Sequence, residues 1–407
     1  MIVSKQLLNL PVNFNDDIKV LPTYKLIEYL GFVQFMGAGL PATNPIGQLI
    51  LNNIENIVKE AIKKEGFYES SFPSLIDKDL FRTSGRDNKF CNEIFYLNST
   101  NYVLCSSIEE LYLKYVHKYL YSYKQLPTFI FSLDKRFRNT FTKRGINRLR
   151  EFELAEIVGF HQNLSEAKES LTHFEGLFRQ IFSNLSIKNV VKCVIPNKNQ
   201  ILFLHKSPEG EHELFFCEKE HVVEMHDVKD GKLCSLCGSP VLKQKAFGMG
   251  MFYIYDTDLV RAFDVFFDGK LRKKELVTLS SYSIGLMRLF YGVIDEHRTA
   301  QGLSLPNNIA PFQVSLLTPM GLCLKEETET MSFYNILREN KIQCMYDDRA
   351  NVPVTTKKIC SDYLGIKHKI VMRRDLEGTV EFDLEEHFQE KTLSKGINSI
   401  LSILKSI

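Results

Sequence analysis

The sequence has no run of about 18 or more apolar residues, the length that a membrane-spanning helix needs, so we expect no membrane span. Its nine cysteines are too few for a dense disulfide framework in a chain of 407 residues, which favours a reducing compartment. No arginine precedes Arg82, so the N-terminal segment lacks the features of an Arg-rich transit peptide or a secretory signal. These absences favour the cytoplasm and leave an atypical organelle address open.

A strong overall charge is also missing. The formal net charge is +2 at pH 7, so any contact with RNA must come from local basic patches rather than from a global field. Hydrophobic residues make up 44% and charged residues 25% of the chain, as in an ordinary globular protein. The length allows about two or three domains with a substantial core.

Hydrophobic periodicity predicts alternating helices and strands in the first half of the chain. The predicted elements are a helix at 50–66 capped by Gly66, a strand ending at Pro73, a helix from Ser107 to Leu120 that opens with a capping box, and strands at 128–133 and 151–159. The segment 135–150 joins the last two strands and is basic, with no acidic residue. It predicts a strand, a basic loop and a second strand.

The second half of the chain divides at Pro306–Pro311, where two prolines interrupt both neighbouring patterns. Before this linker we expect an irregular region at about 165–245, strands at 252–254 and 262–267, and a helix carrying Arg288. After it the pattern predicts strands at 313–317, 343–346 and 369–372 and helices at 331–339 and 355–363. That alternation is typical of an α/β domain with a largely parallel sheet.

Two arginines are candidates for binding a reacting phosphate. Arginine suits this task because its planar fork binds phosphate and carboxylate oxygens in pairs. Arg138 lies on the predicted strand–loop–strand unit, and Arg288 opens a late helix. Phe152, beyond the basic loop, offers a face for a nucleobase. The alternative is that 135–150 is a solvated basic hairpin and Arg288 a surface residue.

In these segments the sequence resembles the prolyl-tRNA synthetase family of class II, in its compact bacterial and mitochondrial form. The matching motifs are 39–75 (motif 1), Ser84–Gly85–Arg86, the six residues 122–127, Phe137–Arg138 with 150–152 (motif 2), Ile284–Gly285 with Arg288 (motif 3), the junction 309–312, Asp347–Asp348–Arg349 and Leu364–Gly365–Ile366.

The resemblance implies an α/β fold with an antiparallel class II catalytic core and a C-terminal α/β anticodon-binding domain. The catalytic domain would span 1–305, with a reduced, irregular insertion at about 165–245, and the anticodon-binding domain 311–407. There is no room for the large editing insertion of many bacterial members. The resemblance also implies a homodimer, because motif 1 builds the dimer interface in class II, and a compact architecture found in mitochondrial members. We therefore expect the mitochondrial matrix or the cytoplasm.

The implied activity is that of a proline–tRNA ligase. Proline and ATP, with Mg²⁺, would give prolyl-adenylate, and the prolyl group would pass to the 3′ end of tRNA(Pro). Arg138 and Arg288 would be catalytic. The implied ATP-binding residues are Arg138, Thr140, Arg150, Phe152 and Arg288, and the implied proline-binding residues are Ser107, Glu109, Arg138, Tyr253 and Ser281. For Ser107, the capping box is an alternative to a role in binding.

Two departures from the family pattern bear on activity. Thr140 stands where motif 2 has an acid that helps to hold ATP, and Met251 stands where the family has a histidine at the proline pocket. The alternative function is therefore a catalytically silent or specificity-altered paralogue that binds tRNA or a protein partner.

One cysteine pair has the spacing of a zinc knuckle. Cys234 and Cys237 form a C-x-x-C followed by glycine, and Cys217 and His221 lie upstream at plausible spacing, with His226 as a competing fourth ligand. Four protein ligands leave no open position, so a bound zinc would be structural. The alternative is a pair of free thiols in a turn.

Overall fold

The computed structural model of the chain describes residues 1–6, 8, 10–14, 17–89, 92–142, 145–195, 199–217, 219, 222–223, 233–234, 237–374, 379–386 and 392–406. Contacts divide it into two compact units, one made of Met1–Gln34, Ala42–Asn53 and Val293–Ile407, and the other of Phe35–Pro41 and Ile54–Gly292. These units differ from the predicted catalytic domain (1–305) and anticodon-binding domain (311–407). Those two domains stay a prediction.

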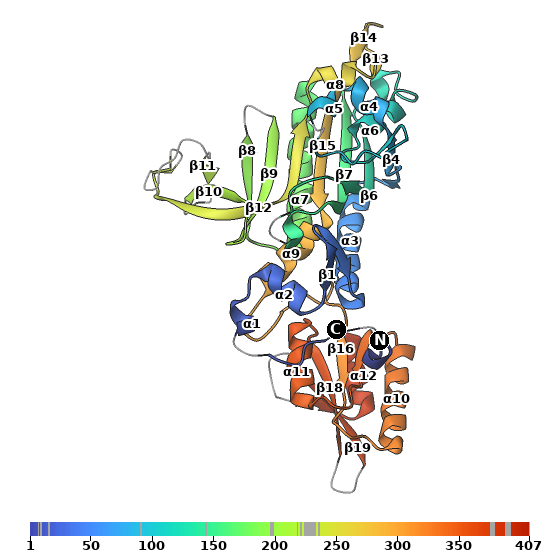
Figure 1. Cartoon of the computed structure of the whole chain (residues 1–407), viewed down its shortest axis with the longest axis vertical. Helices are drawn as coiled ribbons and strands as arrows, with labels where there is room; N and C mark the ends of the chain where they lie inside the picture. The colour runs from blue at the N-terminus through green and yellow to red at the C-terminus, as the bar shows by residue number, and fades with distance from the viewer. Residues whose placement is uncertain are drawn as a thin grey trace. The chain divides into compact units, whose positions relative to one another are not determined.

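The second unit, Phe35–Pro41 with Ile54–Gly292, is built on one large sheet whose strands are mostly antiparallel (Figure 1). Its order is β11 (Val222–Val223), β10 (His212–Cys217), β12 (Val241–Ile254), β15 (Thr278–Gly285), β7 (Glu151–His161), β6 (Thr128–Phe137) and β3 (Glu69–Ser70), while β9 (Gln200–Lys206) pairs with β12 and with β8 (Val190–Ile195). Only the β3–β6 pair among these printed pairs is parallel. The antiparallel core and the strands at 128–133 and 151–159 are confirmed.

Helix α7 (Leu164–Asn184) covers one face of this sheet and corrects the prediction of an irregular region at 165–245. Its buried positions include Phe174 and Phe178, four residues apart on one helical face. Phe174 packs against Tyr282 of β15, with ring centroids 4.0 Å apart, and Phe178 packs against Phe252 of β12 at 4.7 Å. The remainder of that region contains the regular strands β8, β9 and β10, so it extends the sheet.

Several shorter elements also differ from expectation. α6 (Glu109–Val116) begins after Ile108, and no side chain caps it, so the capping box at Ser107 is wrong. The strand predicted to end at Pro73 is β3, which ends at Ser70. The strand predicted at 262–267 is shorter and begins only at Phe266. The other elements of this part of the chain are β4 (Leu75–Asp77), α4 (Lys78–Thr83), α5 (Arg86–Lys89), β5 (Tyr102–Leu104), η2 (Tyr123–Gln125), η3 (Gly145–Asn147), α8 (Thr257–Arg261), β13 (Phe266–Asp268) and β14 (Lys274–Leu276).

The helices predicted at 50–66 and around Arg288 are confirmed as parts of longer elements. They are α3 (Pro45–Lys64), after which Gly66 adopts a positive φ of 86°, and α9 (Leu286–His297). The first elements of the chain are η1 (Val3–Lys5), α1 (Asp17–Val20), α2 (Thr23–Tyr29), β1 (Val33–Gly37) and β2 (Leu40–Thr43).

The C-terminal part of the first unit is a second sheet with the order β17 (Cys344–Asp347), β16 (Val314–Leu317), β18 (His368–Arg374), β19 (Val380–Glu386), β20 (Thr392–Lys395). The pairs β17–β16 and β16–β18 are parallel, and β18–β19 and β19–β20 are antiparallel. The predicted largely parallel sheet is therefore parallel in two of these four pairs. The helices are α10 (Leu324–Glu339), α11 (Val354–Tyr363) and α12 (Ile397–Ser406). The N-terminal residues join this sheet, because Tyr346 donates its backbone N–H to the Met1 carbonyl at 2.7 Å.

One glycine of the second unit allows two backbone segments to touch. A Cβ added at Gly210 would lie 2.3 Å from the backbone nitrogen of Ala246 in β12. We expect Gly210→Ala to lower the free energy of unfolding by about 1–3 kcal/mol, because the clash is with backbone that cannot rotate away. At Gly176 in α7 a Cβ would meet nothing within 4 Å. Gly176→Ala should therefore stabilise by about 0.4–1 kcal/mol, and urea unfolding of both variants checks the contrast; equal shifts would contradict it.

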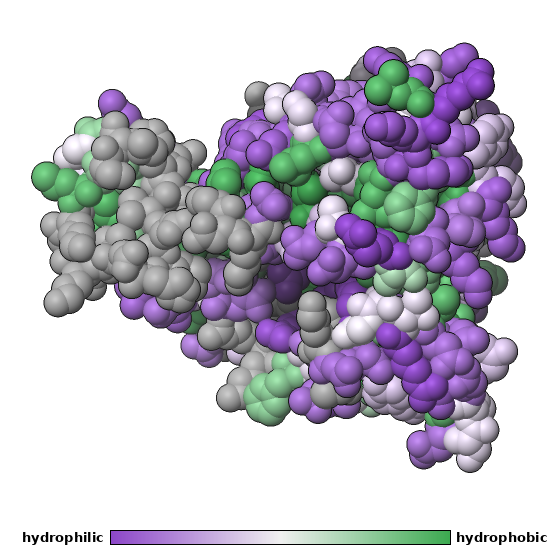
Figure 2. Space-filling view, turned by 90° about the horizontal axis from the view of Figure 1, so that it is seen from above, coloured by the Kyte–Doolittle hydropathy of each residue, from purple (hydrophilic) through white to green (hydrophobic). Residues whose placement is uncertain are grey.

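On the face seen in Figure 2, hydrophilic residues predominate and hydrophobic residues gather in small separate groups. No described helix combines the length and apolar content needed to cross a membrane.

Candidate active site

The large sheet carries a cavity of about 780 Å³ on the face opposite α7. Because successive side chains on a strand point to opposite faces, Ser281 and Ser283 of β15 line the cavity while Tyr282 between them packs on α7. The same alternation brings Phe152, Leu154 and Glu156 of β7 into the cavity wall, and Glu153 lines the cavity as well. Period-2 patterning therefore accounts for the two serines of β15 and for three of the four β7 residues in the wall.

Arg138 lies at the cavity just beyond the end of β6. Its backbone N–H donates to the Arg150 carbonyl at 2.8 Å, and its Nε donates to the Ser106 carbonyl at 3.1 Å. The guanidinium lies 5.3 Å from the centre of the Phe152 ring. Both residues line the cavity. Burial lowers the pKa of Arg138, but a guanidinium stays charged at any physiological pH.

Arg288 reaches the same cavity from the first turn of α9. One terminal nitrogen donates to the Gly248 carbonyl at 2.7 Å, and the other pairs with Glu211 Oε1 at 3.0 Å. The structure thus brings Arg138 and Arg288 together, although they lie far apart in the sequence. Neither arginine is fully solvated: Arg138 is partly buried, and the side chain of Arg288 is 30% exposed.

Arg136 was not assigned a role from the sequence, yet it is the most buried of the described basic residues in 135–150. It is 1% exposed and pairs with Glu156 Oε2 at 3.2 Å. Burial raises the pKa of Glu156 to about 7, and the charge of Glu109 adds to this while Arg136 opposes it. The alternation of Arg136 and Arg138 along the chain was the signal that both face the cavity.

Glu109 lies in the cavity wall within a dense hydrogen-bond network. Its Oε2 accepts from Arg86 at 2.9 Å, and its Oε1 accepts from the Tyr255 hydroxyl. The Tyr255 hydroxyl also lies 3.2 Å from Ser281 Oγ. Burial favours the neutral form of Glu109, but Arg86 and the Tyr255 hydrogen bond outweigh it and hold its pKa at about 2.

Ser107, next to Glu109, lines the cavity with an unused hydroxyl. Its Oγ is buried and has no hydrogen-bond partner among the described residues. A buried polar atom without a partner is costly, so this hydroxyl is suited to a bound ligand.

The remaining predicted residues fall in different places. Thr140 lines the cavity and accepts a hydrogen bond from Arg148 Nε at 2.9 Å. Arg150 instead donates to the Ala38 carbonyl at 3.3 Å and is not among the described lining residues. Tyr253 also is not among them: it packs against Tyr255, with ring centroids 4.7 Å apart, and Tyr255 is the tyrosine that lines the cavity.

Sequence reasoning missed several residues at this cavity. They are Glu93, Arg136, Glu156, Gln200, Glu211 and Tyr255, with Arg86 behind them. Arg86 belongs to the Ser84–Gly85–Arg86 motif, so the sequence drew attention to this residue but did not indicate what it does. Met251 lines the cavity as expected from its place in the family pattern.

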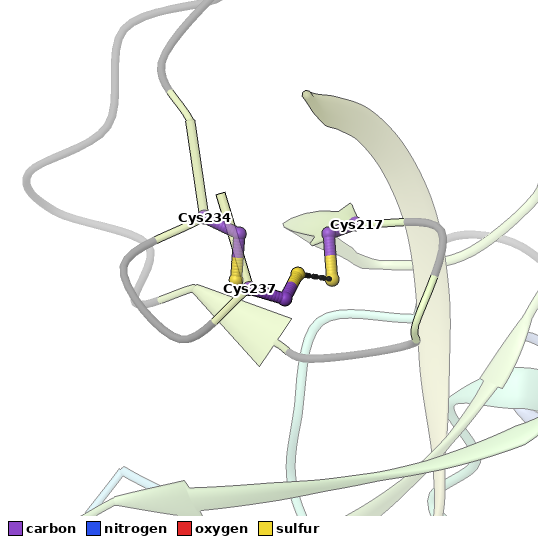
Figure 3. A group of neighbouring side chains, drawn as sticks. All are labelled: Cys217, Cys234 and Cys237. Atoms are coloured by element: carbon purple, nitrogen blue, oxygen red, sulfur yellow. Dashed lines mark hydrogen bonds between the residues drawn. The ribbon is translucent and has the colours of Figure 1, made fainter. Parts of the chain in front are cut away.

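A separate cluster of cysteines lies at the end of β10. Cys217, Cys234 and Cys237 direct their side chains toward one another (Figure 3), and their sulfur atoms all lie within 4.8 Å of one another. The sulfurs of Cys237 and Cys217 lie 3.5 Å apart. Zn–S bonds of about 2.3 Å in a tetrahedron separate sulfurs by about 3.8 Å, so the three sulfurs are spaced as three of the four ligands of a zinc site would be. His221 and His226 lie outside the described residues.

The fold agrees with the comparisons to known proteins. The family model of the tRNA synthetase class II core domain (G, H, P, S and T) matches residues 92–297. This chain belongs to that family of class II tRNA synthetase cores. Its curated relatives include the proline–tRNA ligase of Neorickettsia sennetsu, 24% identical over 98% of this chain and 98% of the relative, and that of Ehrlichia canis, 25% identical over 96% of this chain and 95% of the relative.

Solved structures show the same fold. The prolyl-tRNA synthetase of Cryptosporidium parvum complexed with L-proline and AMP has a TM-score of 0.70 at 18% identity, over 94% of this chain and 74% of that one. The Giardia lamblia prolyl-tRNA synthetase in complex with prolyl-adenylate has a TM-score of 0.70 at 17% identity, over 96% of this chain and 80% of that one. The resemblance to prolyl-tRNA synthetases is confirmed.

Proposed function

We propose that this chain is a proline–tRNA ligase whose chemistry takes place in the cavity on the large sheet. The observation that carries the proposal is the meeting of Glu109, Arg138 and Arg288 in that cavity. An anionic pocket residue and two fixed guanidinium groups match an amino acid with a positive nitrogen and a nucleotide with negative phosphates.

In the activation step, a carboxylate oxygen of proline bonds to the α-phosphorus of ATP and pyrophosphate leaves. Negative charge spreads over the phosphate oxygens, and preorganised cations stabilise it. We assign this role to Arg138 and Arg288, with Phe152 as the adenine platform and Thr140 as a neutral hydrogen-bonding contact. Arg150 is assigned to support of the segment containing Ala38, given its contact there.

Mg²⁺ bound with the nucleotide would supply a further positive charge to its phosphates. The described cavity walls include the carboxylates of Glu93, Glu153, Glu156 and Glu211, which are oxygen donors of the kind that Mg²⁺ prefers. The donor chemistry of the cavity therefore fits a magnesium nucleotide.

For proline, we assign the imino nitrogen to Glu109 and a hydrogen bond to the free hydroxyl of Ser107. Ser281 supports this pocket through Tyr255, and Arg138 is near enough to influence the charge of Glu109. Tyr253 is assigned to packing behind Tyr255 rather than to contact with proline.

The experiment that tests the function is proline-dependent ATP–pyrophosphate exchange, run beside alanine, cysteine and a control without amino acid. Exchange with proline supports the proposal and makes Thr140 and Met251 tolerated variations. Exchange with another amino acid would replace it with altered specificity. A folded, ATP-binding protein without exchange would identify a silent paralogue that binds tRNA or a partner.

The wider assignments follow from the same family. We propose tRNA(Pro) as the acceptor, a homodimer as the working form and the cytoplasm or mitochondrial matrix as the location. Motif 1, which includes α3, supports the homodimer, and light scattering of the purified protein measures its mass directly.

The cysteine cluster is proposed to hold one structural Zn²⁺. We expect about one equivalent of zinc per chain by elemental analysis, and its loss in Cys234→Ser because the remaining sulfurs cannot complete the site. Cys323→Ser serves as the control, since Cys323 is exposed at the N-cap of α10, where serine is favoured. A metal-free wild-type protein whose melting temperature is unaffected by a chelator would contradict the assignment.

A further inference from the structure

The guanidinium of Arg86 lies between the carboxylates of two consecutive residues, Glu109 and Glu110. One terminal nitrogen of Arg86, Nη1, donates to Glu109 Oε2 at 2.9 Å and also to Glu110 Oε1 at 3.1 Å. The side chains are 14% exposed for Arg86, 9% for Glu109 and 0% for Glu110. Ion pairs this deeply buried are costly to break, because the partner left behind is an uncompensated charge.

The chain forms this arrangement with a tight turn. Gly85, between α4 and α5, adopts a positive φ of 67°, which glycine accepts without strain, and Arg86 follows at the start of α5. On the other side of the turn, the Ser84 hydroxyl donates to Glu110 Oε1 at 2.9 Å. The turn therefore directs two donors at the first turn of α6, where acidic residues are favoured by the helix dipole.

Glu109 is fixed from both sides and still able to bind a ligand. Arg86 holds one oxygen and Tyr255 holds the other. An ionised carboxylate has about four acceptor sites, so acceptor capacity remains on the cavity side. Among the described residues, Glu109 and Tyr255 line the cavity, whereas Arg86 and Glu110 do not, so Arg86 acts on a ligand through Glu109.

The electrostatics separate the two acids. Burial raises the pKa of Glu110 to about 7, whereas Arg86 and Tyr255 overcome burial at Glu109 and hold its pKa at about 2. The acid that faces the cavity thus holds its charge more strongly than the acid behind it.

We propose that Arg86 is a positioning residue of the amino-acid site, which holds Glu109 toward the cavity and anchors it to Glu110 and Ser84. The inference rests on the proposed function, because Glu109 is the residue assigned there to the imino nitrogen of proline. It extends that function to a residue that touches no substrate.

The test compares Arg86→Met and Arg86→Lys in ATP–pyrophosphate exchange, with KM measured for proline and for ATP. Loss of a buried charged partner predicts a rise in the KM for proline of about 30-fold or more in Arg86→Met. Arg86→Lys should lie between this variant and wild type, because lysine restores the charge without the planar fork. The KM for ATP should stay within about twofold, since the nucleotide contacts are elsewhere.

Arg82→Met is the matched control. Arg82 lies four residues earlier, with 57% of its side chain exposed, in a surface pair with Asp79 at 2.6 Å, and its loss should change neither KM. Equal rises in both KM values would show a general structural role and overturn the inference, as would unchanged kinetics in Arg86→Met. A wild-type protein without proline-dependent exchange would instead overturn the proposed function, and this inference with it.

Discussion

Arg138→Ala is expected to lower proline-dependent ATP–pyrophosphate exchange by about 10²–10³-fold, which is the cost of removing one preorganised donor from a transition state that develops negative charge. The Arg138 guanidinium is held by the Ser106 carbonyl and the ring of Phe152, and the backbone N–H of Arg138 is held by the Arg150 carbonyl. Its charge is thus fixed before substrate binds. Exchange rates at saturating proline and ATP measure the loss.

Two further variants show whether geometry or charge matters at this position. Arg138→Lys keeps the charge and loses the paired donors, so it should recover only part of the activity. Arg179→Ala removes an arginine from the exposed face of α7, where it pairs with Glu175 at 2.8 Å, and should leave exchange unchanged. Wild-type exchange in a folded Arg138→Ala protein would remove Arg138 from the catalytic assignment.

Glu109→Gln is expected to raise the KM for proline by about 10²-fold with a smaller change in the KM for ATP. The amide has nearly the same shape, and its oxygen can still accept from Arg86 or Tyr255. What it lacks is the charge that pairs with the positive nitrogen of proline. The substitution therefore separates the charge of Glu109 from its place in the packing.

The control for Glu109→Gln is the same change at an exposed position. Glu60 in α3 has 63% of its side chain exposed, and Glu60→Gln should leave both KM values unchanged. If Glu109→Gln also leaves the KM for proline unchanged, the imino nitrogen is recognised elsewhere in the cavity. Melting temperatures of the variants show that each one is folded.

Residue type and motif order pointed to Arg138 and Arg288, and the structure brings both to one cavity, while their catalytic role stays a prediction. The partners were harder to predict. That Tyr255 rather than Tyr253 contacts Glu109 depends on how the end of β12 approaches α6, which no local pattern encodes. The closeness of Cys217 to Cys237 likewise depends on pairing in space between β10 and β12, where Cys217 lies opposite Val241.

Some of what was missed was present in the sequence. The spacing of Phe174, Leu177, Phe178 and Ile181 is that of one helical face, so α7 was predictable. Val380, Phe382 and Leu384 alternate with acidic residues as a half-buried strand requires, and they form β19. Asp383, on the other face of that strand, is 3% exposed and pairs with Arg373 at 2.7 Å. A hydrophobicity pattern places such an acid in solvent, so its burial could not be predicted from the sequence.

Glu211, which forms an ion pair with Arg288, competes with any anionic ligand for the Arg288 guanidinium. With Glu211 at 3.0 Å, Arg288 is already oriented and already neutralised. An anion that binds to Arg288 therefore exchanges one negative partner for another, and the gain is the difference between the two partners rather than the full attraction. Glu211 therefore lowers the advantage that a phosphate-bearing ligand gains at Arg288 over an uncharged nucleoside.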